Sequence, residues 1–88
     1  MKVAFRASFL RDLDNVTDKS FLVRAKKIIE EVEQAADLSR VRNVKKLRGT
    51  VNCYRIRLGE YRFGLLLEED ALVLVRFLHR KDVYRYFP

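Results

Sequence analysis

The stretch YRIRLGEYRFG, residues 54–64, alternates apolar and charged side chains on both sides of a Gly-Glu pair. Alternation with a period of two is typical of a half-buried β-strand. A glycine in the first position of a two-residue turn favours a type II′ hairpin. The predicted hairpin has four facing pairs: Leu58 and Tyr61, Arg57 and Arg62, Ile56 and Phe63, and Arg55 and Gly64.

The predicted register gathers Arg55, Arg57 and Arg62 on one face of the hairpin. Like charges directly opposite one another destabilise a sheet. The pairing of Arg57 with Arg62 therefore indicates an anion bound between them. Gly64 lies on the same face and is expected to leave a hollow in front of Arg55, since glycine within a strand often marks the close approach of a ligand or of backbone.

The excess positive charge of the chain is concentrated in one segment. The net charge is +7, with 19 basic and 12 acidic residues. Seven of the basic residues and no acidic residue lie between Ser39 and Gly59, so the other 12 are balanced by the 12 acids. Such a segment is typical of a nucleic-acid or acidic-protein binder. The alternative is a basic loop that is merely solvated.

The length and composition predict one small cytoplasmic domain spanning residues 1–88. The single cysteine, Cys53, excludes an internal disulfide and a cysteine metal site. No apolar run reaches the roughly 20 residues of a membrane helix. Arg6, Arg11 and Asp12 interrupt any signal-peptide core. We expect no membrane association, no cofactor and no metal.

Hydrophobic periodicity predicts the remaining elements. Apolar residues at helical spacing indicate an amphipathic helix over Lys19–Asp37, begun by Thr17 or Asp18. Ser8 is expected to cap a short helix over Ser8–Leu13. The other expected elements are strands at Met1–Phe5, Cys53–Leu58, Tyr61–Glu68 and Ala71–Leu78, a basic connector at Ser39–Gly49, a tight turn at Glu69-Asp70 and a helical turn at Asp82–Phe87.

This order predicts an α+β fold with helices packed on an antiparallel sheet. The length of the second turn is left open. A two-residue loop places Phe77 and His79 on the arginine face, whereas a three-residue loop places Arg76 and Leu78 there. If the strands form a meander, the tail HRKDVYRYFP, residues 79–88, begins beside the start of the Arg62 strand.

The tail carries groups that suit RNA chemistry. Arginine forks bind phosphate, tyrosine rings stack on bases, and histidine titrates near neutral pH. These ingredients fit RNA cleavage by internal transesterification. The alternatives that involve no chemistry are core packing for Tyr84 and Tyr86 and a structural role for His79.

Three motifs in this order resemble the RelE/ParE toxin superfamily. They are NVKKLRG at 43–49, YRIR at 54–57 with Tyr61-Arg62, and HRKDVY at 79–84. The RelE branch fits best. The resemblance implies a microbial RNase-like RelE fold and a toxin that cuts mRNA in the ribosomal A site without a metal. A 2′-hydroxyl would attack the adjacent phosphate and leave a 2′,3′-cyclic phosphate. The implied partners are a cognate antitoxin protein, the ribosome and mRNA.

The resemblance also implies roles for individual residues. Arg62 matches the arginine that stabilises the transition-state phosphate, and Arg55 and Arg57 match two basic residues of the preceding strand. Arg80 matches the arginine that stabilises the leaving group. The remaining expected catalytic residues are Tyr84, which would stack on or orient the base, and His79. We expect RNA and ribosome contacts from Arg40, Arg42, Lys45, Lys46, Arg48 and Lys81.

One departure from the family concerns the general base. Some members carry lysines where this chain has Arg55 and Arg57, and arginine cannot lose its proton. His79 and Tyr84 remain as candidates, or catalysis is mainly electrostatic. Two other functions stay open, namely a ParE-like inhibitor that binds DNA gyrase and an RNA-binding module that does not cleave.

Overall fold

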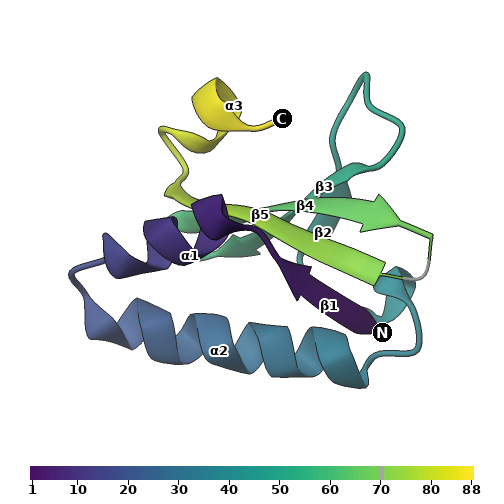
Figure 1. Ribbon diagram of the computed structural model, residues 1–88, viewed down its shortest axis with the longest axis horizontal. Coiled ribbons are helices and arrows are strands. Elements are labelled where there is room, and N and C mark those ends of the chain that lie inside the picture. Colours follow the sequence, from purple (N-terminus) through teal and green to yellow (C-terminus); the bar gives the residue numbers. More distant parts are fainter. Residues whose placement is uncertain (70) are drawn as a thin grey trace.

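The computed structural model describes residues 1–69 and 71–88, so the second half of the expected Glu69-Asp70 turn lies outside the described residues. Two helices lie on one side of a sheet, and a short helix lies on the other (Figure 1). The elements are β1 (Lys2–Phe5), α1 (Ala7–Asp14), α2 (Lys19–Gln34), a 3₁₀ turn η1 (Leu38–Arg40), β2 (Val44–Lys46), β3 (Cys53–Leu58), β4 (Tyr61–Glu68), β5 (Ala71–His79) and α3 (Val83–Tyr86).

The sheet is mixed, which corrects the expectation of an antiparallel one. Its strand order is β1-β5-β4-β3-β2. β1 runs parallel to β5, and the other neighbours are antiparallel. The long connection through both helices and three strands allows β1 and β5 to point the same way. The basic connector also contains an edge strand, β2, that its sequence did not predict.

The hairpin at residues 54–64 is confirmed. Gly59 has φ +58°, a left-handed conformation that glycine adopts readily. All four expected pairs are present, including Arg57 opposite Arg62 and Arg55 opposite Gly64. Three arginines therefore do share one face of the sheet.

A β-bulge between β4 and β5 resolves the alternatives for the second turn. Glu68 pairs with Ala71, which is the register of a two-residue loop. Gly64 nevertheless pairs with Arg76 while Leu65 pairs with Leu74, so β5 carries one extra residue at this point. The bulge reverses the side-chain alternation beyond it. Leu78, opposite Arg62, therefore lies on the arginine face.

The helices α1, α2 and α3 all have bounds that differ from the prediction, and α3 spans Val83–Tyr86 instead of Asp82–Phe87. α2 ends at Gln34 instead of Asp37, because Ala35 is extended and the Met1 amine binds the carbonyls of Glu33 and Ala35 at 3.0 and 2.8 Å. The Asp37 carboxylate then accepts the Ser39 N–H at 2.9 Å and starts η1. α1 begins at Ala7, so Ser8 is not its cap. The Ser8 hydroxyl instead donates to the Val75 carbonyl at 2.6 Å and ties α1 to the bulged strand.

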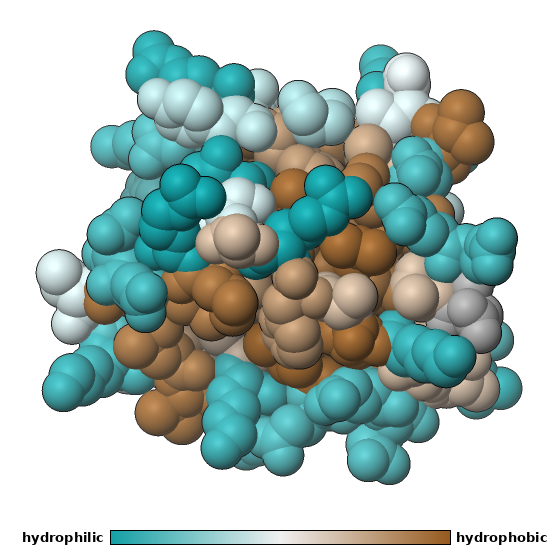
Figure 2. Space-filling view, in the orientation of Figure 1, coloured by the Kyte–Doolittle hydropathy of each residue, from teal (hydrophilic) through white to brown (hydrophobic). Residues whose placement is uncertain are grey.

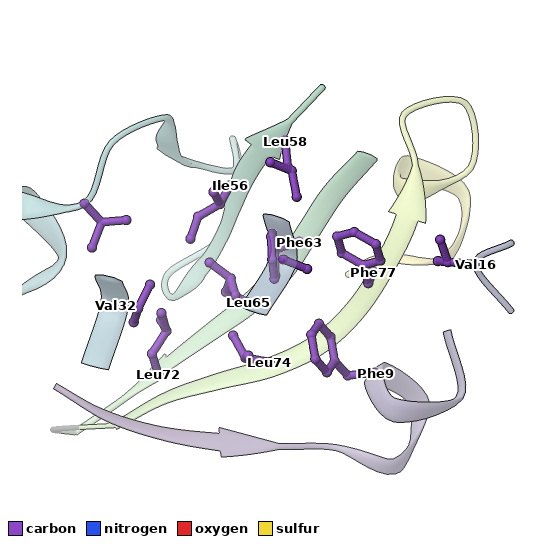
Figure 3. Packing of buried hydrophobic residues seen from close by; sticks show 12 residues of the cluster. Phe9, Val16, Val32, Ile56, Leu58, Phe63, Leu65, Leu72, Leu74 and Phe77 are labelled. Carbon is purple, nitrogen blue, oxygen red and sulfur yellow. The ribbon is translucent and has the colours of Figure 1, made fainter. Parts of the chain in front are cut away.

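The main core lies between the sheet and the helices α1 and α2 (Figure 3). Phe9 of α1 contacts Phe63 and Phe77, with ring centroids 5.9 and 6.3 Å away. A smaller core lies under α3 on the arginine side of the sheet. It contains Cys53, Val83 and Phe87, with Leu47, Leu66, Val75 and Leu78 packed against them. β4 and β5 are apolar on both faces because each face is covered.

The β1 edge of the molecule is apolar. Figure 2 shows brown and tan side chains across the middle of the face on which Figure 1 draws β1 and α1, with teal side chains at the margins. Phe5 and Leu10 are about half exposed there. This edge is far from β2, which carries lysines at the opposite edge of the sheet.

Candidate functional site

Arg62 occupies the start of β4, where the hairpin turn fixes its guanidinium. Its Nη1 donates to the carbonyl oxygens of Gly59 at 2.7 Å and Tyr61 at 2.9 Å. A guanidinium has five N–H donors, and both of these bonds use one nitrogen. The hairpin thus holds the charge in place while donors remain for a phosphate.

The surroundings of Arg62 are electropositive. Burial lowers the pKa of its guanidinium, and so do the neighbouring positive charges, whereas a tyrosine acts in the opposite direction. The groups that act on it are, in decreasing order of effect, Arg55, Tyr84, Arg57 and Arg80. Since like charges repel, this cluster favours an anion among its members. The structure brings five of the six expected catalytic residues together.

His79 is the sixth, and it lies on the helix side of the sheet, although it shares the Glu60 carboxylate oxygen with Arg80. It pairs with Tyr61 across β4 and β5, and the two rings meet edge to face at 5.8 Å on the helix side of the sheet. Its Nδ1 accepts the Lys81 N–H at 3.1 Å, and its Nε2 lies 3.6 Å from Glu60. These contacts give His79 a role in the turn that leads into the tail.

Glu60 connects the hairpin turn to the tail. Its carboxylate lies 3.1 Å from Arg80 Nε, and its carbonyl accepts the Arg80 N–H at 2.7 Å. The tail therefore starts beside the β4 strand, as the meander predicted. This contact holds Arg80 close enough to act on Arg62.

The hollow expected at Gly64 is filled by the protein itself. The Phe87 ring packs over this glycine, so a Cβ added to Gly64 would lie 2.7 Å from Phe87 Cγ. Phe87 is only 3% exposed. The expected hollow at Gly64 is therefore not open, and the close approach that the glycine permits is made by the tail.

α3 projects its tyrosines outward. Val83 and Phe87 are buried, whereas Tyr84 and Tyr86 are 58% and 54% exposed. Tyr84 acts on the Arg62 charge. The Tyr86 ring lies 5.6 Å from Cζ of Arg76. The alternative of core packing is therefore excluded for both tyrosines.

The basic connector splits between the two sides of the sheet. Lys45 pairs with Arg55 on the arginine face, and Lys46 pairs with Tyr54, whose side chain packs on the helix-side core. Alternation along β2 thus directs these two lysines to opposite faces. A shallow hollow of about 220 Å³ extends the arginine face, lined by Asn43, Val44, Lys45, Arg55 and Arg57.

The other four expected binding residues lie outside the strands that form this face. Arg42 is 3.9 Å from Glu31 of α2, and Arg40 lines a hollow beside α2. Arg48 is exposed in the loop of residues 47–52, and Lys81 is exposed in the turn before α3. Figure 1 shows that loop and α3 rising from the same side of the sheet.

Comparison with known proteins identifies the family. A family model described as the ParE toxin of the type II toxin–antitoxin system, parDE, matches residues 3–84. The chain is a toxin of the RelE/ParE superfamily. It is 42% identical to Toxin RelE3 of Methanocaldococcus jannaschii over the full length of both proteins.

Solved structures confirm the RelE fold. The RelB-RelE antitoxin-toxin complex from Methanococcus jannaschii contains a chain with a TM-score of 0.82 and 39% identity, covering 97% of this chain and 99% of that one. The isolated E. coli RelE toxin matches with a TM-score of 0.64 at 21% identity, covering 96% of this chain and 90% of that one. Because its identity is only 21%, the second match shows only that the two proteins share a fold.

Sequence reasoning missed a buried ion pair behind the site. Asp12 of α1 is 7% exposed and binds Arg76 of β5 through two hydrogen bonds, of 2.7 Å to Nε and 3.0 Å to Nη2. It also accepts the Phe77 N–H at 2.9 Å. The hydrogen bond to Asp12 raises the pKa of Arg76. The one available signal was an arginine that interrupts the apolar run of residues 71–78.

The arrangement suits the binding and stabilisation of a phosphate. Arginines supply planar donors for phosphate oxygens, and the exposed Tyr84 ring offers a surface for a base. Among residues 1–69 and 71–88, no three His, Cys, Asp or Glu side chains lie together as metal ligands would. No helix in the same ranges is long and apolar enough to cross a membrane.

Proposed function

We propose that this toxin is a ribosome-dependent endoribonuclease that cuts mRNA in the A site. The observation that carries the proposal is the strand register that places Arg55, Arg57 and Arg62 on one face. Glu60 holds Arg80 beside the same hairpin turn, and Tyr84 lies within electrostatic range of Arg62. Preorganised positive charge that meets developing negative charge is a large term in enzyme catalysis. The 42% identity to Toxin RelE3 supports the same reading.

In the proposed reaction, the 2′-hydroxyl oxygen of one nucleotide attacks the adjacent phosphorus. The bond from phosphorus to the 5′-oxygen breaks, which leaves a 2′,3′-cyclic phosphate and a 5′-hydroxyl. The attacking hydroxyl loses a proton, and the leaving oxygen gains one. Arg62 stabilises the charge that builds on the phosphate, with Arg55 and Arg57 beside it, and Arg80 stabilises the leaving oxygen.

Of the two candidates for proton transfer named from the sequence, His79 and Tyr84, Tyr84 lies on the arginine side of the sheet. Tyr84 carries an ionisable hydroxyl within electrostatic range of Arg62. His79 lies on the helix side, against Tyr61. We therefore assign His79 to the structure of the turn and leave Tyr84 and charge stabilisation to support the reaction.

Binding to the ribosome and to the antitoxin completes the proposal. Lys45 extends the arginine face toward the β2 edge and would contact RNA phosphates. Toxin chains with this fold occur in RelB-RelE complexes, so we propose a cognate antitoxin of the RelB kind. The site of action would be the cytoplasm, and we expect neither metal nor cofactor to take part.

A purified translation system with a stalled ribosome and an empty A site tests the activity. The account predicts new mRNA 5′ ends at the A-site codon and matching 3′ ends that carry a cyclic phosphate. The family model is described for ParE toxins, which makes gyrase inhibition the second candidate. Intact mRNA together with inhibited supercoiling by gyrase would replace the first proposal with the second.

A further inference from the structure

The short helix α3 needs outside contacts to hold its position. It has four residues, and isolated helices of that length are unstable in water. Val83 and Phe87, four residues apart, lie on one side and pack into the smaller core. These two contacts attach the helix to the sheet.

The two tyrosines of α3 lie on opposite flanks of that buried side. Successive residues of a helix are about 100° apart, so Tyr84 is offset in one direction from Val83, and Tyr86 in the other from Phe87. The Tyr86 ring packs on the Arg76 guanidinium. Tyr84, on the other flank, is exposed and lies within electrostatic range of Arg62. A contact that holds Tyr86 in place therefore limits the rotation of α3 about its axis and sets the direction in which Tyr84 points.

Arg76 is itself held firmly. Both oxygens of the Asp12 carboxylate bind its guanidinium, and the same carboxylate accepts the Phe77 N–H. A bidentate pair of this kind sets the plane of a guanidinium as well as its position. Its Cζ lies over the Tyr86 ring, in the geometry of a cation–π contact.

We propose that Arg76, clamped by Asp12, is a positioning residue that fixes the rotation of α3 through the Tyr86 ring and so presents Tyr84 to Arg62. The orientation of α3 by Arg76 is a property of the protein alone. The effect of that orientation on catalysis rests on the proposed RNA cleavage. Arg76 contacts Asp12 and the Tyr86 ring, and its effect on the arginine cluster would pass through α3.

Tyr86→Leu is the variant that tests this proposal with least risk to folding, because Tyr86 is exposed. Tyr86→Phe is the matched control, since it keeps the aromatic face. In the free protein, the Phe87 N–H donates to the Val83 carbonyl at 2.8 Å, so its hydrogen exchange reports the closure of α3. Loss of an exposed cation–π contact should make the exchange of the Phe87 amide about two- to fivefold faster.

We expect that increase in Tyr86→Leu and wild-type exchange in Tyr86→Phe, with core amides unchanged in both. In an Arg76→Met background, Tyr86→Leu should cause no further increase in exchange at Phe87, because the cation that the ring contacts has already been removed. In single-turnover cleavage, Tyr86→Leu should lower the rate while ribosome binding is kept, and Tyr86→Phe should restore it.

Wild-type exchange at Phe87 in Tyr86→Leu would overturn the proposal. Faster exchange with an unchanged cleavage rate would overturn its catalytic part. If the wild-type protein does not cut mRNA at all, the proposed function fails, whereas the exchange result still decides whether Arg76 holds α3.

Discussion

The Phe87 ring lies directly over Gly64, at a spacing that only a glycine permits. This contact joins the C-terminal tail to the strand beside Arg55, and it anchors the helix that carries Tyr84. The site is therefore assembled from the hairpin and the tail, and neither part is complete without the other.

Gly64→Ala should loosen this junction. The new Cβ would lie 2.7 Å from the ring, so Phe87 must move, and overpacking of this kind costs about 1–3 kcal/mol. Denaturant unfolding measures the cost. In a Phe87→Ala background the same change should be nearly neutral, because the clash is gone. Equal costs in both backgrounds would contradict the contact.

Asp12→Ala should destabilise the protein by about 2–3 kcal/mol, less than for a fully buried pair because the Arg76 side chain is 25% exposed. The change leaves Arg76 and the Phe77 N–H without their partner. Glu31→Ala is the control, since the exposed Glu31–Arg42 pair is 3.9 Å apart and should contribute less than about 0.5 kcal/mol. Denaturant midpoints distinguish the two, and equal midpoints would refute the role of the buried pair.

Lys45→Ala and Lys46→Ala form a matched pair on opposite faces of β2. Lys45 lies beside Arg55, so its removal should weaken ribosome binding and reduce the salt slope by about one. Lys46→Ala should leave both quantities close to wild type. Binding titrations at several salt concentrations make the comparison. The arginine face is not the RNA surface if Lys46→Ala has the larger effect.

Two capping aspartates, Asp18 and Asp37, should make the stability of the protein fall at acid pH. Hydrogen bonds from Ser20 hold the pKa of Asp18 below its ordinary value, and Ser39 does the same for Asp37. A carboxyl with a lowered folded-state pKa stabilises the fold above its unfolded pKa, and this contribution is lost as pH falls through the folded value.

The double variant Asp18→Asn, Asp37→Asn keeps capping side chains that do not titrate. Its melting temperature should lie below that of the wild type at pH 7, and the difference should shrink as pH falls below about 4. Thermal unfolding followed by circular dichroism gives both curves. A constant difference across this range would show that the caps do not act through their charge.

The hairpin could be predicted from sequence because its determinants are local. A turn with glycine in first place and strict alternation around it fix the register of Arg57 and Arg62. The helix α2 was predicted from its stripe of apolar residues, but its end was not. Ala35 and Ala36 continue the stripe, but Ala35 is extended and the distant Met1 amine binds the carbonyls of Glu33 and Ala35.

The rest of the site depends on distant contacts that no local pattern reveals. The bulge that turns Leu78 toward Arg62 lies where Ser8 and Asp12 of α1 bind the backbone of β5. The same bulge directs Phe77 and His79 toward the helices. The filling of the Gly64 hollow by Phe87 likewise joins residues far apart in the chain.

Arg62→Ala is the most direct test of the central claim, which is that the arginine cluster stabilises the phosphate during cleavage. Single-turnover mRNA cleavage on stalled ribosomes and ribosome affinity should be measured together, with Arg42→Ala as the control from the helix side. We predict at least about a hundredfold slower cleavage for Arg62→Ala with affinity largely kept, and near wild-type cleavage for Arg42→Ala. Cleavage by Arg62→Ala at the wild-type rate, on ribosomes bound equally well, would contradict the account.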